Sequence, residues 1–427
     1  MTIKVTHFVC SGCGLCVALC PRKALRLGFS VEGHFKPFLN RALCNNCGLC
    51  VKICPFTSSY NEKEVKQVIS NFTNRMIGDY LRVGLAWSTD KNTRFRSASG
   101  GAVTSILKYL LEKGIVNAVL APKVQVKQGL VFGSYEIVCD GEEIQKYAGS
   151  IYAPVDITKA LREAFARNLR IALVGLPCQV RGLRNSLKQL PLLNENIKVV
   201  FGLYCYNLPS SRAVECAIKM FLRKDPEEIL HIAFRGGGWP GYTTITTKDG
   251  KTFKIPSQAF WDSGFGQYFY GKACLLCPDH TAELADISFA DPWTYQRNIG
   301  AGKTLVIIRT KPGLEVLNGA VKSGHLGFEE IPAIHAVQHA TLLKKTVKVT
   351  TIKTTRYSYE LPLSISSVVH ELDYLVGSRL AKYKRLWSLL RLYVKSRPYL
   401  LKHLITLDYL LKTELTRMLD KISRTWL

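Results

Sequence analysis

The strongest constraint on this chain is a cysteine pattern that occurs twice near its start. The pattern Cys-x2-Cys-x2-Cys-x3-Cys-Pro runs from Cys10 to Pro21 and again from Cys44 to Pro55, with every cysteine offset by 34 residues. Gly and Leu follow the second cysteine in both copies. Residues 1–60 are therefore predicted to form one pseudo-symmetric module, whose core is too small to be stable without a bound metal.

Three closely spaced thiolates on a tight loop, followed by a fourth on the next turn, are typical of 4Fe–4S ferredoxins. In two-cluster ferredoxins the fourth cysteine of each run ligates the other cluster. Zinc is the alternative, but zinc sites usually pair two Cys-x2-Cys units and do not use the third cysteine. The pattern thus predicts two crossed ligand sets: Cys10, Cys13, Cys16 and Cys54 for one cluster, and Cys44, Cys47, Cys50 and Cys20 for the other.

Beyond this module the hydrophobic pattern predicts a mixed α/β (α+β) fold. Short apolar runs rich in β-branched residues alternate with helical patterns, at 81–87, 115–121, 170–174 and 199–204 for strands and 102–113 for a helix. Such runs favour a mixed sheet with parallel stretches. The predicted organisation is a two-cluster ferredoxin-like domain (1–60), the two parts of a flavin and iron–sulfur domain (78–160 and 161–340) and a basic helical extension (341–427).

Net charge narrows the classes of partner. The chain has 58 Lys and Arg against 32 Asp and Glu, a formal charge of +26. We do not expect nucleic-acid binding, because no recognition module is present. The first sixty residues hold 7 basic side chains and one acid, Glu32, which favours an acidic redox protein as the partner. Residues 379–427 carry a net +9 and are split by Pro398 into two predicted helices, which either pack on the protein or anchor it to an anionic membrane or to a partner.

The predicted location is the cytoplasm, with attachment to a membrane surface left open by the basic extension. No uncharged apolar run reaches the 18 residues that a membrane-spanning helix needs. The first ten residues show no secretory signal pattern, and the 14 cysteines are then expected in a reducing compartment, where they bind metals more often than they form disulfides.

Six cysteines lie outside the repeat. Cys178 and Cys205 each follow a predicted buried strand, where ligands of α/β sheets collect, and Cys274-x2-Cys277 occupies a short loop. These four could hold a third 4Fe–4S cluster, although a Cys-x2-Cys unit also binds zinc or acts as a redox pair. The other two, Cys139 and Cys216, have no such placement.

Two glycine-rich turns are candidates for cofactor contacts. The small-residue turn 97–102 precedes a helix, so its amides and the helix dipole could meet a phosphate, or it could simply cap the helix. The loop 235–241 contains Trp239 and could stack on a planar ring, or it could be a mobile surface loop.

Taken together, these segments resemble the family of coenzyme F-420 hydrogenase/dehydrogenase beta subunits. The resemblance spans about residues 80 to 312 and is carried by the motifs at 99–104, 174–179, 202–205, 234–239, 274–279 and 285–293. It implies a flavoprotein with FAD and a 4Fe–4S cluster of its own, ligated by Cys178, Cys205, Cys274 and Cys277.

The resemblance also implies a reaction. Family members pass electrons between the deazaflavin coenzyme F-420, which exchanges a hydride, and a partner, and FAD can convert such an electron pair into single electrons for the clusters. Ser99, Gly100, Gly101 and Tyr152 are the expected flavin contacts, and no side chain is expected to act as a covalent catalyst. Two alternatives remain: a flavin and iron–sulfur reductase of another organic substrate, and an electron-relay subunit with no substrate of its own.

Two positions depart from the family pattern. The family often has Lys where this chain has Ile151, which removes a cationic contact to the flavin or to an anionic substrate. It also often has Gly where this chain has Ala290. FAD is therefore a firmer expectation than F-420.

Overall fold

The computed structural model describes residues 9–56, 72–257, 269–295, 300–338, 341, 342 and 344. The predicted helices of residues 379–427 and most of the predicted connector 61–77 lie outside the described residues. Within the part that is described, no helix is long and apolar enough to cross a membrane.

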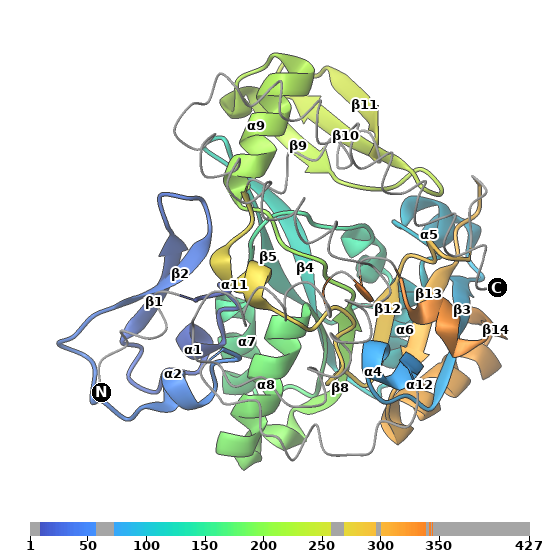
Figure 1. The fold of residues 1–427 in the computed structure, drawn as a ribbon, viewed down its shortest axis with the longest axis horizontal. Coiled ribbons are helices and arrows are strands. Elements are labelled where there is room, and N and C mark those ends of the chain that lie inside the picture. Colours follow the sequence, from blue (N-terminus) through green and yellow to red (C-terminus); the bar gives the residue numbers. More distant parts are fainter. Residues whose placement is uncertain are drawn as a thin grey trace, which may run out of the picture.

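A nine-stranded mixed sheet forms the body of the molecule (Figure 1), which confirms the predicted fold class. Its order is β14-β3-β13-β12-β8-β7-β4-β5-β6. The central strands β12, β8, β7 and β4 run parallel to one another, as do β5 and β6, while the other neighbours are antiparallel. The strands are β3 (Arg82–Ser88), β4 (Ala118–Lys127), β5 (Leu130–Val138), β6 (Val155–Asp156), β7 (Ile171–Gly175), β8 (Ile197–Leu203), β12 (Ile287–Ala290), β13 (Thr304–Ile308) and β14 (Leu326–Glu330).

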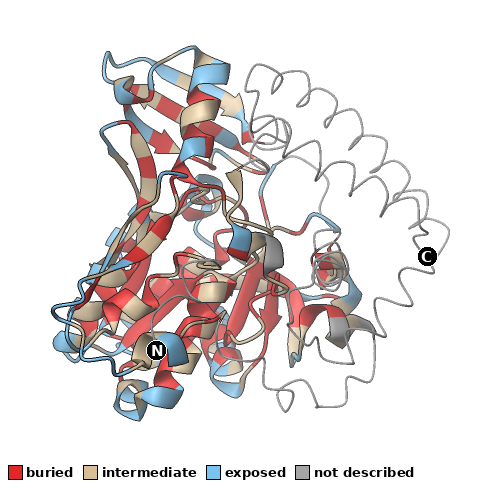
Figure 2. Cartoon of the chain, turned by 60° about the vertical axis from the view of Figure 1, so that its left-hand side comes forward, coloured by how far each residue is buried: buried red, intermediate tan, exposed pale blue. Residues whose placement is uncertain are grey.

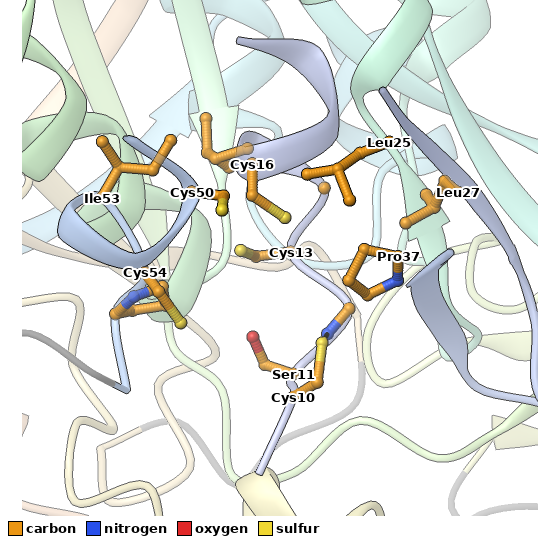
Figure 3. A pocket seen from close by; sticks show the side chains of 14 residues that line it. Cys10, Ser11, Cys13, Cys16, Leu25, Leu27, Pro37, Cys50, Ile53 and Cys54 are labelled. Atoms are coloured by element: carbon orange, nitrogen blue, oxygen red, sulfur yellow. Dashed lines mark hydrogen bonds between the residues drawn. The ribbon is translucent and has the colours of Figure 1, made fainter. Parts of the chain in front are cut away.

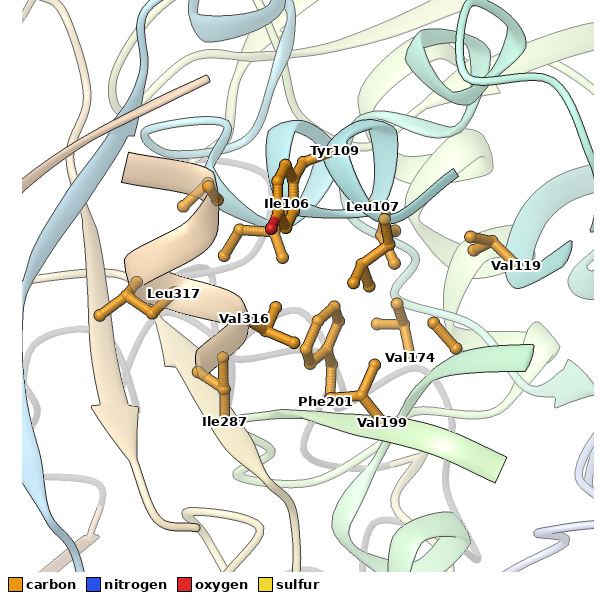
Figure 4. Close-up of a cluster of buried hydrophobic side chains, with 14 of the residues drawn as sticks. Ile106, Leu107, Tyr109, Val119, Val174, Val199, Phe201, Ile287, Val316 and Leu317 are labelled. Atoms are coloured by element: carbon orange, nitrogen blue, oxygen red, sulfur yellow. The ribbon is translucent and has the colours of Figure 1, made fainter. Parts of the chain in front are cut away.

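Helices cover both faces of this sheet, because the side chains of its buried strands alternate between two cores. Ala172 and Val174 of β7 face the core that contains α6 (Ala102–Glu112) and α12 (Lys311–Lys322), part of which is drawn in Figure 4. Ile171 and Leu173 face the opposite core. The helices of that face are α7 (Thr158–Ala166) and α8 (Pro177–Gln189), and farther along the sheet α4 (Phe72–Ile77) packs on β3 and β13.

A smaller antiparallel sheet lies above the body in the view of Figure 1. It has the order β11-β10-β9 and packs on α9 (Ser211–Leu222). Its strands are β9 (Ile229–Ala233), β10 (Tyr242–Thr247) and β11 (Thr252–Pro256). The remaining short helices are α5 (Lys91–Arg96), α11 (Lys272–Leu276) and 3-10 turns at Glu143–Tyr147, Pro191–Glu195, Pro226–Glu228 and Ala333–Ala336.

The cysteine-rich module is built from two similar halves around a hairpin. Its elements are α1 (Leu15–Ala18), β1 (Leu25–Phe29), β2 (Phe35–Leu39) and α2 (Leu49–Lys52). Gly14 and Gly48, which precede the two short helices, both have positive φ (81° and 73°), a backbone conformation that glycine adopts without strain. The sequence repeat is therefore also a repeat of backbone conformation.

This module shares a hydrophobic core with the body (Figures 1 and 2). Leu15 and Ile53, each about 1% exposed, are buried together with residues of α7 and α8. Gly182 of α8 leaves room for Leu15, since a Cβ there would lie 3.3 Å from the Leu15 side chain. Arg162 of α7 donates a hydrogen bond to the Val17 carbonyl at 2.7 Å. The small core of the module is thus extended by the surface on which it docks.

Candidate metal and cofactor sites

The first predicted ligand set lines one hollow of the module. The sulfur atoms of Cys10, Cys13, Cys16 and Cys54 point into it, with Cys50 beside Cys16 (Figure 3). Cys10 and Cys13 lie on the loop that leads into α1, Cys16 lies in α1, and Cys54 follows α2. Burial raises the pKa of Cys10, Cys13 and Cys16, and the neighbouring Cys54 thiolate raises all three further.

The second predicted set gathers on the outer side of the module. Burial raises the pKa of Cys50. The negative charges of the neighbouring thiolates of Cys47, Cys20 and Cys44 raise this pKa further. Cys47 is exposed, whereas the other three are partly buried. The structure therefore brings each run of three cysteines together with the fourth cysteine of the other run, while ligation itself stays a prediction.

Backbone amides face the sulfurs in the same way in both halves. Gly12 N–H donates to Cys10 Sγ at 3.3 Å, and Asn46 N–H, 34 residues later, donates to Cys44 Sγ at 3.4 Å. Ala24 N–H donates to Cys20 Sγ at 3.3 Å. A hydrogen bond to the charged form of a thiol favours the thiolate, which is the form that binds metal. The donor set and its amides fit iron–sulfur clusters.

The third predicted set lies at one edge of the main sheet. Cys178 follows β7 and Cys205 follows β8, and because these strands are parallel both cysteines lie at their carboxyl ends. Cys274 is in α11 and Cys277 ends that helix. Burial is the largest cause of the strongly raised pKa of Cys178. The neighbouring thiolates of Cys13, Cys205, Cys277 and Cys274, in decreasing order, raise it further. The four cysteines therefore converge, although they come from three separate segments.

These sets are wider than a site for one ion. Among the residues that the structure describes, no three His, Cys, Asp or Glu side chains are grouped closely enough to hold a single metal ion. A zinc site needs its sulfurs about 2.3 Å from one ion. In a 4Fe–4S cube each thiolate binds a different iron atom, so the thiolates stand farther apart, and wider sets are compatible with it.

The three sets follow one another in space. A pocket between the third set and the first is lined by Cys178 and Cys274 on one side and by Cys10 and Cys13 on the other. The first set adjoins the second, since Cys50 influences the pKa of Cys16. The order is third, first, second, and it ends at the exposed Cys47.

The predicted flavin contacts occupy two segments. Ser99 Oγ donates to the Lys303 carbonyl at 2.6 Å, and Gly101 begins α6 with a φ of 74°. Gly100 N–H donates to Thr304 Oγ1 at 2.9 Å, and a Cβ at Gly100 would lie 2.6 Å from the Ala86 carbonyl oxygen. Gly100 thus allows a close approach of backbones, and its amide is engaged within the protein.

A buried ion pair between Arg235 and Asp291 joins these segments. Arg235 donates to the Ala98 carbonyl, next to Ser99, and it also interacts with Tyr152. Burial raises the pKa of Asp291, with Arg235 and then Ser99 opposing that rise. The predicted contacts Ser99 and Tyr152 therefore meet at one ion pair, although 53 residues separate them.

Aromatic rings surround this ion pair. The Arg235 guanidinium lies 5.3 Å from the centre of the Trp239 ring and 5.9 Å from that of Trp293. Trp239 is 2% exposed and Trp293 42% exposed, with ring centres 4.5 Å apart. Tyr152 packs edge-on against Phe234. The alternative of a mobile surface loop at 235–241 is wrong, because Trp239 is buried and the amides of the loop bond to the Phe95 carbonyl.

Comparison with known proteins places the chain in a family. The model for the N-terminal part of coenzyme F-420 hydrogenase/dehydrogenase beta subunits matches residues 83–162, and the model for their C-terminal part matches residues 168–334. The chain belongs to this family. A 4Fe–4S dicluster domain model matches residues 9–58, so this member carries a two-cluster module in front of the family domain.

Several relatives of the chain are beta subunits of enzymes that are named for F-420. It is 28% identical over 53% of its length to the beta subunit of F-420-dependent formate dehydrogenase 1 from Methanococcus maripaludis, and that match spans only 56% of the relative. It is 28% identical to the beta subunit of coenzyme F-420 hydrogenase from Methanothermobacter thermautotrophicus, over 63% of this chain and 91% of the relative. The fold is similar to a chain of the F-420-reducing [NiFe] hydrogenase complex from Methanosarcina barkeri, with a TM-score of 0.51, 22% identity and coverage of 65% and 93%.

Sequence reasoning did not assign several residues of these sites. Arg235, Asp291 and Trp293 stood in family motifs, but no local pattern predicted that they would meet. Lys344, which lies beside the third cysteine set, gave no signal at all, because it is one of many lysines in a basic segment. Cys139 is exposed, and Cys216 lies in α9 with its Sγ 3.8 Å from the Met220 sulfur.

Proposed function

We propose that this protein transfers electrons between coenzyme F-420 and a protein partner, through FAD and three 4Fe–4S clusters. The observation that carries the proposal is the order of the cysteine sets, which lead from the edge of the main sheet to the exposed Cys47. The names of its relatives support F-420 as the two-electron partner. Electrons could flow in either direction along this order.

The aromatic site around Arg235 is the proposed flavin site. When bound there, FAD would supply the exchange between a hydride and single electrons. The Arg235–Asp291 pair would hold the Ser99 turn and Tyr152 in place, and the Trp239 and Trp293 rings would border the planar ring.

The flavin site and the third cysteine set are close along the chain. Pro154 and Val155 line the pocket that also contains Cys178, and Tyr152 precedes them by two and three residues. Three extended residues span at most about 11 Å. The short segment 152–155 therefore links the proposed site of hydride exchange to the proposed first cluster.

The surface around the second set suits an acidic redox protein. Leu43 and Val51 are 45% and 36% exposed beside Cys47. In residues 9–56 the single acid is Glu32, which faces Lys36 at 3.9 Å on the hairpin. Exposed basic residues that lie within three positions of a cysteine of this set in the sequence are Arg22, Lys23, Arg41 and Lys52. Positive charge around an apolar centre would guide a negatively charged partner to the outermost cluster.

Anaerobic reconstitution with iron, sulfide and FAD tests the proposal. We expect about twelve irons and one FAD per chain, with reduction of the clusters by reduced F-420. Cys205→Ser should lower the iron content by about four, whereas Cys216→Ser, a matched change outside the three sets, should leave it unchanged. About eight irons and no flavin in the wild-type protein would contradict the proposal and favour a relay subunit without a substrate of its own.

A separate experiment tests the partner. Reduction of a small acidic ferredoxin should slow when Lys52→Glu reverses one charge beside Cys47, and the effect should weaken as salt rises. Lys254→Glu, on the distant strand β11, is the control. Equal rates for the two variants would rule out this surface as the docking site.

A further inference from the structure

A lysine is buried beside the third cysteine set. The side chain of Lys344 is among the largest that are fully buried, with the residue 1% exposed. Its Nζ donates to the carbonyl oxygens of Cys205 at 2.5 Å and Asp279 at 2.7 Å. One of these carbonyls belongs to a predicted ligand, and the other lies two residues after Cys277.

Moving an ammonium group from water into the protein interior costs free energy unless negative charge lies nearby. Nζ of Lys344 donates to two carbonyl oxygens, which accept its hydrogen bonds but carry no full negative charge. Asp279 already has other partners, because its Oδ1 accepts from Ala282 N–H at 2.8 Å and from Glu283 N–H at 3.4 Å. A cluster bound at Cys205, whose own carbonyl accepts from Nζ, would therefore place negative charge next to Lys344.

Two other described residues near Lys344 in the sequence contact the proposed redox sites. Thr341 Oγ1 lies 2.7 Å from Nδ1 of the buried His280. The Gln338 side chain donates to the Asp291 carbonyl, beside the proposed flavin site. Lys344 is thus placed by contacts with the family domain, although it lies beyond residue 334, where the family model ends.

We propose that Lys344 is a positioning residue whose fixed positive charge raises the reduction potential of the third cluster. This inference rests on the proposed function, since it requires a cluster at Cys178, Cys205, Cys274 and Cys277. Each electron that a cluster accepts adds a negative charge, and a cation in a buried site stabilises that charge more than one in water does. Lys344 therefore makes the cluster nearest the flavin site a better acceptor of single electrons.

Redox titration followed by EPR tests the role of Lys344 in the reconstituted full chain. Lys344→Gln keeps hydrogen-bond donors and removes the charge, whereas Lys344→Arg keeps the charge. In the glutamine variant we expect the equilibrium constant for one-electron reduction of the third cluster to fall at least about tenfold. This corresponds to a shift of its reduction potential by about 59 mV to more negative values. The other two clusters should keep their potentials, and the arginine variant should stay close to the wild type.

Iron analysis separates the outcomes. If all three proteins hold about twelve irons and share one potential for the third cluster, the proposal is overturned. If both variants lose about four irons, Lys344 serves only to build the site, which also overturns it. Loss of about four irons in the glutamine variant alone would mean that the charge is needed to hold the cluster and not to set its potential, which overturns the proposal as well. A wild-type protein with about eight irons would instead remove the third cluster, a failure of the proposed function that is recognised before any variant is made.

Discussion

The two halves of the cysteine module have the same motif and different surroundings. In α1, Leu15, Val17 and Ala18 are buried, whereas α2 has no buried residue. A Cβ at Gly14 would lie 3.0 Å from Ile157 of the body, whereas nothing lies within 4 Å of one at Gly48. The difference arises because the first half docks on α7 and α8. One repeated sequence thus forms a buried first half and an exposed second half, which under the proposed function would serve as internal relay and external contact.

The largest test of this comparison removes one ligand from each half. Cys13→Ser and Cys47→Ser should each lower the iron content by about four. With reduced F-420 as the donor, the Cys13 variant should lose reduction of the remaining module cluster, because the connection to Cys178 is broken. The Cys47 variant should keep reduction of the first cluster. Rapid-freeze EPR measures both, and equal behaviour of the two variants would contradict the order of the sets.

Truncation of equivalent leucines tests the docking itself. Leu15→Ala should lower the free energy of unfolding by about 2–5 kcal/mol, because it leaves a cavity between α1 and α8. Leu49→Ala, 34 residues later and only partly buried, should lower it by about 1 kcal/mol. Chemical denaturation of the reconstituted protein gives both values. If Leu49 proved as costly as Leu15, the asymmetry between the halves would be wrong.

Equivalent glycines test the same contact by adding volume. Gly14→Ala and Gly48→Ala both place alanine at positive φ, at a cost of about 1–2 kcal/mol each. The added methyl at position 14 also meets Ile157 and Thr158, which should destabilise the protein by about 1–3 kcal/mol more. The difference in unfolding free energy between the two variants is the quantity to measure. A difference near zero would mean that the module yields without strain.

Much of this arrangement could be predicted from sequence, because it depends on local patterns. The repeat predicted the crossed pairs, which the structure brings together, and the ends of the apolar strands placed Cys178 and Cys205 at one edge of the sheet. The asymmetry of the halves was not predicted, because Leu15 and Leu49 stand in the same Cys-Gly-Leu-Cys-Val stretch; the one local signal is Lys52, a charged residue at the position equivalent to the buried Ala18. Arg235 with Asp291, and Lys344 with Cys205, meet only through tertiary packing, for which a single sequence contains no signal.

The smallest test concerns the polar part of the docking interface. Arg162 Nη2 donates to the Val17 carbonyl at 2.7 Å, and its Nε lies 3.4 Å from the Ala18 carbonyl, so it satisfies the end of α1 from α7. Arg162→Ala should lower the unfolding free energy by about 1–3 kcal/mol, because these bonds come from a charged donor. The control is Arg167→Ala, which removes a half-exposed pair with Glu163 and should change the free energy by about 0.5 kcal/mol or less. Hydrogen exchange sharpens the result: the amides of 17–19 should lose protection in the Arg162 variant, and those of 51–53 should not. Loss of protection in both halves would mean that the module opens as one unit. The two halves would then differ in how Leu15 and Leu49 are packed but not in local stability.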